Sequence, residues 1–351
     1  MDDLDNNHCY DSWRWKPSDY NSLTEEQHLP FFVRAGMLAA SVHNSQPWRV
    51  ELLSQKEFIL TADPEYSVVE GDPSKMGLKI SLGCFLMNVE VAAEYFNYQM
   101  TYKIDDQSIL VSICKKNADL SLAGEDGFFS DLCLSITDRR SNKFAYRTGL
   151  GIDRALQEIQ AASSLFTGIE FHYSSEQQTI EDVSVLHQRA IRNIRSPFWR
   201  ELFTWSPLLR ETSCVGIPPD VFGISDRVFR VMRYFFSKFP SIVPVVMSAK
   251  DKKLIRHKTP LIGVISSSSI MGIEDGINVG RFYEFASLYA AKYNFAMTPI
   301  HAMVEDKQMN HEVSSLFGIS SGFRSQMIFR FGYPVKASSH TPRMSFDDIL
   351  I

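Results

Sequence analysis

Hydrophobic and polar positions follow two periods along this chain. Residues 31–40 and 76–98 have the apolar spacing of buried helices, and residues 47–52, 58–62 and 109–114 are short strand-like runs between turn formers. The order returns later, with strands predicted at 261–265 and 326–331 and a long helix at 277–295. The pattern predicts two similar units, each built of strands and one long helix.

The two long helices align at an offset of 197 residues. Gly83 falls on Gly280, and four further identities follow: Phe85 with Phe282, Ala93 with Ala290, Asn97 with Asn294 and Met100 with Met297. Similar burial alone selects similar residues in two amphipathic helices. The shared helix end, N-[YF]-x-M, nevertheless favours an internal duplication.

These patterns suggest three regions. Residues 1–30 lack a sustained period and are expected to form an N-terminal arm, residues 31–130 a first half, and residues 131–351 a second half. Residues 190–245 have no counterpart in the first half and are rich in aromatic side chains and arginine. They form either a helical layer packed on the core or a lid over a site, because long insertions in compact domains are often functional.

Composition excludes several classes of protein. The 351 residues are 44% hydrophobic and carry a net charge of −5, which argues against a general nucleic-acid binder. Five cysteines without a CxxC pair are expected to be reduced thiols and not a zinc site. The N-terminus is acidic, and no run approaches the ~20 apolar residues of a membrane span. We therefore expect a cytoplasmic protein with no metal and no membrane partner.

Three segments carry candidate chemistry. The first is a helix-to-strand turn that contains Ala40, Ser41, Val42, His43, Asn44 and Gln46. The second is a basic run before the middle of the chain, with Arg139, Arg140, Ser141 and Lys143. The third is a C-terminal segment that contains Arg343. Arginine forks bind phosphate oxygens in pairs. In an extended R-x-S-x-K, the three alternate side chains face one way. The alternative is a solvated charge cluster at a helix start.

Together the segments resemble the nitroreductase family of flavoproteins. The turn ASVHNSQPW resembles the family's P-S-x-x-N-x-Q-P-W, although Ala40 stands where proline is usual, and RRSNK resembles its R-x-S-x-[RK] phosphate motif. The segment GYP followed by Arg343 is similar to the family's closing strand. The likeness is greatest to the Acg-like tandem branch, in which two domains are fused in one chain.

This resemblance implies an α+β fold with two sheet-and-helix halves in an internal pseudo-dimer. It implies one FMN per chain, because the turn occurs only in the first half and the phosphate motif only in the second. Lys143 is expected to reach the N1/O2 edge of the flavin. The loop Pro299, Ile300 and His301 follows the second long helix, where the family places backbone N–H groups near flavin N5. Lys250 and Lys253 could add a contact.

The implied activity is an FMN-dependent oxidoreductase that takes hydride from NAD(P)H and passes electrons to a nitro, quinone or similar small acceptor. The alternative is a protein that binds or sequesters FMN beneath the insertion with little turnover, and a third reading is an interaction protein with a vestigial site. His43 is expected to be a turn residue and not an acid/base catalyst. The chain is expected to be a monomer with an internal pseudo-twofold, and a further homodimer is compatible with this.

Overall fold

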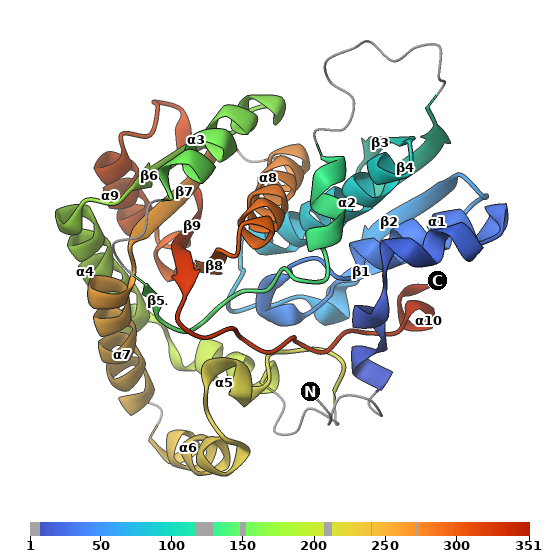
Figure 1. Cartoon of the computed structure of the whole chain (residues 1–351). Coiled ribbons are helices and arrows are strands. Elements are labelled where there is room, and N and C mark those ends of the chain that lie inside the picture. Colours follow the sequence, from blue (N-terminus) through green and yellow to red (C-terminus); the bar gives the residue numbers. More distant parts are fainter. Residues whose placement is uncertain (1–7, 117–128, 148–151, 207–212, 240, 271) are drawn as a thin grey trace.

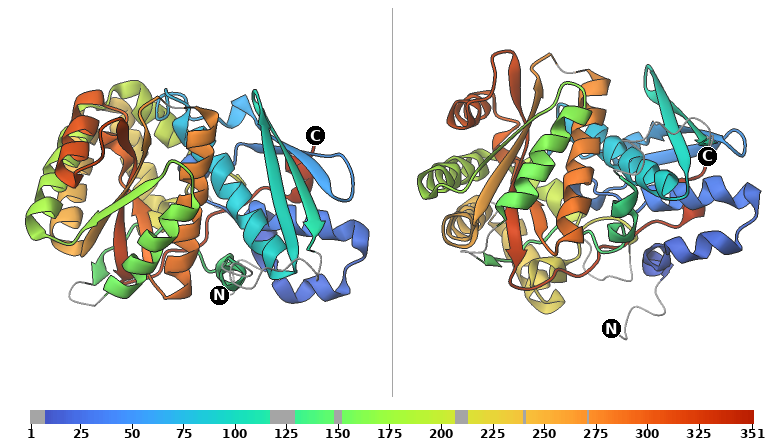
Figure 2. Two further views of the ribbon diagram at one scale, coloured as in Figure 1. Left: turned by 90° about the horizontal axis from the view of Figure 1, so that it is seen from above. Right: turned by 45° about the horizontal axis from the view of Figure 1, so that its top comes forward.

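The computed structural model describes residues 8–116, 129–147, 152–206, 213–239, 241–270 and 272–351. It is an α+β structure with two antiparallel sheets, and two long helices lie between them (Figures 1 and 2). The main helices are α1 (Glu25–Gly36), α2 (Met76–Tyr95), α3 (Asp153–Ala162), α4 (Gln177–Asn193), α5 (Ser196–Thr204), α6 (Asp226–Lys238), α7 (Ile242–Lys258), α8 (Ile273–Lys292), α9 (Lys307–Phe317) and α10 (Phe346–Ile349). The α+β expectation is confirmed.

The first sheet contains β1 (Trp48–Leu52), β2 (Glu57–Ala62), β3 (Tyr98–Asp105) and β4 (Ser108–Lys115). Its strand order is β1-β2-β4-β3, and every pair is antiparallel. Burial alternates along β2, where Phe58 and Leu60 are fully buried and their neighbours are not. One face of this sheet therefore packs on the core that contains α2, as expected for a half-buried strand.

The second sheet contains β5 (Tyr146–Arg147), β6 (Glu170–Ser174), β7 (Leu261–Ser268), β8 (Ala296–Pro299) and β9 (Phe323–Pro334). Its path is β6-β7-β9, and both β8 and β5 pair with the far edge of β9. Strand β7 is buried on both faces, as the apolar run 261–265 predicts. Leu261 and Ile265 join the core around α8, whereas Ile262 and Val264 pack with α4 and α9 on the opposite face.

The two long helices cross in backbone contact at Gly83 and Gly280. A Cβ on either glycine would lie 2.9 Å from the Cα of the other and closer still to a carbonyl oxygen, that of Ile277 for Gly83 and of Ile80 for Gly280. The contacts are reciprocal, because 80 and 277 also differ by 197 residues. Only glycine lets the helices approach this closely.

Helix α2 is also the one described helix long and apolar enough to cross a membrane by composition. However, 83% of its apolar window is buried inside the protein, so it serves here as a core helix.

The two sheets repeat one order of elements. In each, two strands precede a long helix and two strands follow it, and the order β1-β2-β4-β3 matches β6-β7-β9-β8. Asn97 and Asn294, at the same offset, end their helices with left-handed φ values of 62° and 61°. Asparagine tolerates this conformation better than most residues, so the aligned N-[YF]-x-M ends form the same turn.

The N-terminal region differs from the expected pattern. Helix α1 begins at Glu25 and not at Phe31, because Thr24 and Gln27 form a capping box, and it ends at Gly36 before the predicted Ala40. The residues before it form two short 3₁₀ helices, His8–Arg14 and Pro17–Ser22. Trp15 is buried, and its indole N–H donates to the carbonyl of Phe31 at 3.1 Å. This segment therefore packs against the body of the protein.

Candidate functional site

A cavity of about 520 Å³ lies where the first half, the second half and the insertion meet. Thirteen of the fourteen residues predicted for the site line it: Ala40, Ser41, Val42, His43, Asn44, Arg139, Arg140, Ser141, Lys143, Pro299, Ile300, His301 and Arg343. Ile80, Ser81 and Cys84 of α2 and Tyr283 of α8 add to its wall. Segments separated by three hundred residues in the sequence thus form one site.

The turn at residues 41–46 has an unusual backbone. His43, Asn44 and Gln46 all have positive φ, at 51°, 56° and 52°. The side-chain amide of Asn44 donates to the carbonyls of Gly216 at 3.0 Å and Pro342 at 2.9 Å, and its oxygen accepts from Arg343. Strained backbone of this kind persists only where the surroundings fix it, and it concentrates at functional sites. The turn is therefore held in one shape at the cavity wall.

Gln46 is the exception among the predicted contacts. It is fully buried but lies outside the cavity wall. Its Nε2 donates to the carbonyl of Cys214 at 2.7 Å, and its Oε1 accepts from the backbone N–H of Met344 at 2.9 Å. The side chain is satisfied by these partners, so Gln46 ties the turn to the insertion and to the C-terminal segment and does not face the cavity.

Two buried arginines and one buried carboxylate meet at one end of the cavity. Nε of Arg139 lies 2.8 Å from Oε1 of Glu284, and Nη2 of Arg139 donates to the carbonyl of Leu38. Arg343 donates to the carbonyls of Leu38 and Ala39, both at 3.2 Å, and its Nε has no hydrogen-bond partner among the described residues. Burial and the neighbouring Arg139 lower the pKa of Arg343 to about 9.

Glu284 is fully buried, and its other oxygen accepts from the backbone N–H of Ala40 at 3.2 Å. Burial raises its pKa, and Arg139 opposes that shift. One carboxylate thus faces two guanidinium groups. Because a buried charge is costly without a partner, this end of the cavity is suited to a further anion.

Lys143 lies further along the wall. Its Nζ is 6.0 Å from the ring centroid of Phe222, and burial followed by repulsion from Arg330 lowers its pKa to about 8. Arg140 is anchored differently, because its Nη1 donates to the carbonyl of Ser338 at 3.0 Å. Arg139, Ser141 and Lys143 all line the cavity, but so does Arg140 between them, so the wall is not restricted to alternate residues of the segment.

The histidines of the wall are neutral at neutral pH or paired with acid. Burial, then Lys143 and His301, lower the pKa of His43 to about 4. His301 places its Nε2 3.3 Å from Oε1 of Glu305. A proton on His43 would be expelled by its surroundings, so His43 can accept a hydrogen bond but is poorly suited to supply a proton.

The insertion covers part of the cavity. Ile217, Val221 and Phe222 line it, whereas Trp205 does not; Trp205 instead accepts a hydrogen bond at its carbonyl from Ile217 at 2.8 Å. Residues 207–212 of the insertion lie outside the described residues. Part of the insertion, expected to be either a helical layer or a lid, therefore lies at the cavity.

A carboxylate fastens the insertion to the first half. Glu201 on α5 accepts hydrogen bonds from the backbone N–H groups of Val69, Glu70 and Gly71 at 2.6, 2.9 and 2.8 Å. Asp72, the next residue, accepts from Gly77 and Leu78 at the start of α2. The segment VEGDP thus joins the insertion to the helix that forms the floor of the cavity.

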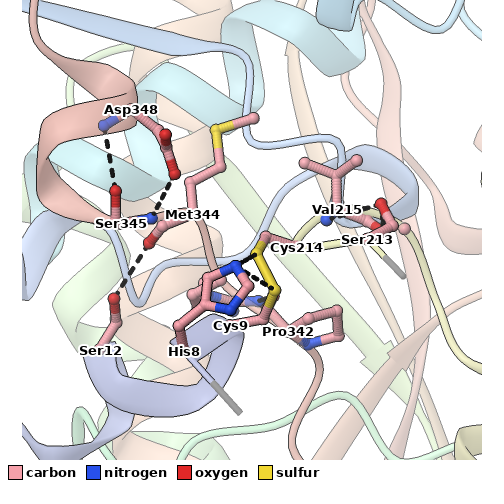
Figure 3. Close-up of a disulfide and its surroundings, with 12 residues drawn as sticks. His8, Cys9, Ser12, Ser213, Cys214, Val215, Pro342, Met344, Ser345 and Asp348 are labelled. Carbon is pink, nitrogen blue, oxygen red and sulfur yellow. Dashed lines mark hydrogen bonds between the residues drawn. A yellow bond between two sulfur atoms is a disulfide. The ribbon is translucent and has the colours of Figure 1, made fainter. Parts of the chain in front are cut away.

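A disulfide links Cys9 to Cys214, which corrects the expectation that all five cysteines are reduced (Figure 3). The other three, Cys84, Cys114 and Cys133, are free. The pairing gives no sequence signal, because the two residues are 205 positions apart and only the fold brings them together. The bond joins the N-terminal segment to the insertion beside the turn at Asn44 and Gln46.

Several wall residues were not foreseen. Trp13 lies under the guanidinium of Arg343, with 4.6 Å between that group and the ring centroid. Arg330 of β9 also lines the cavity, as does Lys250, one of the two lysines considered. Glu284 lies outside the cavity lining but pairs with Arg139, and it had no clear sequence signal, because α8 also contains Glu274, Asp275, Arg281 and Lys292.

The charge of the wall is opposite to that of the chain. Seven basic side chains line the cavity, namely Arg139, Arg140, Lys143, Arg195, Lys250, Arg330 and Arg343, against three acidic ones, Glu70, Asp251 and Glu305. The whole chain carries −5. The rest of the wall contains apolar surface from Val42, Ile80, Phe198 and Met327. The arrangement suits a ligand with a flat apolar part and an anionic end.

The chain is structurally similar to FMN-containing nitroreductases over about three-fifths of its length. No family model matches the sequence, and no curated protein matches it.

Three of the similar structures show the extent of the likeness. The FMN and NADPH-dependent nitroreductase NfnB from Sphigopyxis sp. strain HMH is 13% identical, covering 62% of this chain and 96% of that chain with a TM-score of 0.40. A nitroreductase with bound FMN from Desulfitobacterium hafniense is 10% identical, with coverages of 62% and 95% and a TM-score of 0.40. One from Bacteroides fragilis, also with bound FMN, is 13% identical, with coverages of 61% and 94% and a TM-score of 0.38.

Proposed function

We propose that this protein binds one FMN per chain and is an FMN-dependent oxidoreductase that accepts hydride from NAD(P)H and reduces a nitro, quinone or similar small acceptor. The observation that supports it is the cavity, where the turn and the phosphate motif meet in a basic wall beside apolar surface. The residues fit the cofactor, because Arg139 and Arg343 share one buried carboxylate and Arg343 Nε is unpaired among the described residues.

In this proposal Arg139, Ser141 and Arg343 hold the phosphate, and Glu284 orients the fork of Arg139. The turn 40–44 and the loop 299–301 flank the ring, and Lys143 holds positive charge beside its pyrimidine edge. When bound, FMN supplies hydride acceptance and electron transfer, and the protein positions and tunes it. Val42, Ile217 and Phe222 exclude water from the apolar part of the cavity.

We further propose that the two halves form an internal pseudo-dimer of the Acg-like tandem type. The reciprocal contact of Gly83 and Gly280, the equal strand orders and the paired Asn97 and Asn294 turns support this. Such a chain makes in cis the isologous contact that a homodimer makes in trans. It is then complete as a monomer, and a further homodimer is compatible with it.

A second candidate is an FMN-sequestering protein with little turnover. The three hydrogen bonds that Glu201 accepts from residues 69–71 and the Cys9–Cys214 bond favour it, because they hold the insertion at the cavity. A fixed lid would restrict entry of a bulky nucleotide. Stopped-flow reduction of the purified, FMN-loaded protein by NADPH and by NADH separates the two: rapid bleaching supports the oxidoreductase, and none supports sequestration.

Binding is tested with a paired variant. Removing Arg139 alone would leave Glu284 unpaired, so Arg139→Met with Glu284→Leu replaces the ion pair by apolar side chains. We expect FMN affinity to fall about tenfold or more, because a charged hydrogen bond contributes about 1.5–3 kcal/mol. The matched control is Arg281→Met with Glu90→Leu, an ion pair at 2.6 Å between α8 and α2 outside the cavity. Unchanged affinity in the first variant, or an equal loss in both, contradicts the proposal.

A further inference from the structure

Exposed hydrophobic side chains are concentrated in one part of the surface. Eight of the twenty large ones exposed within the described residues lie between positions 228 and 246: Val228, Val231, Tyr234, Phe235, Phe239, Ile242, Val245 and Val246. Val231 and Tyr234 are each 69% exposed. Such a concentration is unusual for a monomer and marks an interaction surface. Figure 1 shows these residues' helix α6 and the adjoining end of α7 at the edge of the molecule, away from both sheets.

These side chains form stripes at helical spacing on the outer faces of two helices. In α6 the inner face is Phe229 and Phe236, and both side chains are buried. Phe236 belongs to a cluster with Trp199, and the ring of Phe229 lies 6.1 Å from that of Phe203. Val228, Val231 and Phe235 follow at i, i+3 and i+7 and form an exposed stripe on the neighbouring face of the helix. The start of α7 repeats this, with Val243 buried and Ile242, Val245 and Val246 exposed. The core therefore does not account for the second apolar face.

The same surface is basic. Arg227, Arg230, Arg233 and Lys238 of α6 are exposed, and none forms an ion pair with a residue that the structure describes. Residues 226–246, which contain all eight exposed side chains, hold four Lys and Arg against one Asp, a net charge of +3. Since the whole chain carries −5, the remainder carries −8. The charge is thus separated between this segment and the body.

We propose that α6 and the start of α7, residues 226–246, bind the surface of an anionic lipid bilayer. Exposed apolar side chains flanked by Arg and Lys are the pattern of helices that lie in a membrane interface. A second copy of the chain fits less well, because a self-complementary contact would oppose two basic surfaces. The surface is peripheral, so it revises the expected absence of a membrane partner without requiring a span. None of the eight side chains lines the cavity, so the proposal is independent of the proposed function.

The test is flotation of the full chain with vesicles of phosphatidylcholine alone and with about 30 mol% phosphatidylserine. We expect binding to the anionic vesicles only, weakened by salt. Binding to neither, or equal binding to both, overturns the proposal.

Variants then localise the surface. Val231→Glu with Phe235→Glu, and separately Arg230→Glu with Arg233→Glu, should each weaken vesicle binding about tenfold or more. Ile270→Glu, at an 88% exposed residue outside the segment, should leave binding unchanged. The assignment of the membrane-binding surface would be overturned if only Ile270→Glu lost vesicle binding, or if both double variants bound vesicles fully. A native dimer that the Val231 and Phe235 changes convert to a monomer would also overturn it, since a second copy would then cover this face.

Discussion

Gly83 and Gly280 are in contact where α2 and α8 cross, and neither position has room for a side chain because of the other. A Cβ on either would lie 2.9 Å from the partner's Cα. The relationship is reciprocal, as the 197-residue offset predicts. It gives the two halves a contact made only of backbone, which no rotamer change can relax.

Replacement of either glycine by alanine should therefore destabilise the fold strongly. We expect Gly83→Ala and Gly280→Ala each to lower the free energy of unfolding by about 3 kcal/mol or more, since overpacking against backbone has no flexible partner to yield. Guanidinium unfolding followed by circular dichroism measures it. Gly272→Ser, before the first turn of α8, is the control, because its Cβ would meet atoms no closer than 3.4 Å. Equal stability of all three variants would contradict the crossing.

The disulfide predicts a thiol count and a stability difference. Denatured protein prepared without reductant should react with three equivalents of a thiol reagent, and with five after reduction. Cys9→Ser with Cys214→Ser should lower the free energy of unfolding by about 5 kcal/mol in the chain-entropy model for so long a loop. Cys114→Ser, at an exposed cysteine, is the control. Five reactive thiols in the unreduced protein would refute the bond.

The thiol count also bears on location. Disulfides are rare in the cytoplasm, so the cytoplasmic location stays a prediction that this measurement tests.

Lys143 should react as an unusually acidic lysine in the flavin-free protein. With its pKa lowered to about 8, a growing fraction is neutral above that pH, and the neutral amine is the nucleophile. Trace acetylation with mass spectrometry should give a midpoint near pH 8 at Lys143, below the ordinary lysine pKa of 10.5. FMN should protect Lys143. A midpoint near 10.5 would show that the surroundings of Lys143 do not favour the neutral form.

The same shift has a consequence for stability. Between about pH 8 and the ordinary lysine pKa of 10.5, the unfolded chain binds more protons at this residue than the folded chain does. Lys143 therefore makes the free energy of unfolding rise with pH across that window, and this gain is lost as the pH falls back to about 8. Lys143→Met should remove this rise from the pH profile of unfolding.

Glu201 should control how firmly the insertion covers the cavity. Glu201→Ala removes three hydrogen bonds to residues 69–71, so we expect FMN to dissociate about tenfold faster. The recovery of flavin fluorescence after dilution measures the rate. Glu158→Ala, at an exposed pair with Arg154, is the control. An unchanged rate would show that the insertion does not limit release.

The sequence predicted most of the cavity because its motifs are local. The turn after α1 and the run at 139–143 each bring several wall residues from one short segment, and their alternation or turn chemistry is visible without the fold. Gln46 was predicted to face the cavity but does not, because its hydrogen-bond partners Cys214 and Met344 are distant in sequence. A buried glutamine takes whichever partners the fold provides, and no local pattern specifies them.

Periodicity located β1, β2, β4, β7 and β9 and both long helices, but it missed β3, β5, β6 and β8. The side chains of β3 are mostly exposed or half-buried, and β8 has only four residues, so neither carries a strong hydrophobic pattern. The start of α1 was missed because residues 1–30 lack a sustained period, although the capping box of Thr24 and Gln27 begins the helix at Glu25. Trp13 and Glu284 could not be predicted as site residues, because the contacts that bring them to the site are made only in the folded chain.

The Cys9–Cys214 bond closes residues 9–214 into a covalent ring, since its two cysteines are 205 positions apart. That ring contains α1, the whole first sheet, α2, the Arg139–Lys143 run and Glu201. A single proteolytic cut anywhere within it would leave two fragments still joined as one molecule. Such nicked protein would keep the mass of the intact chain, apart from one water, on a non-reducing gel and separate only when a thiol is added.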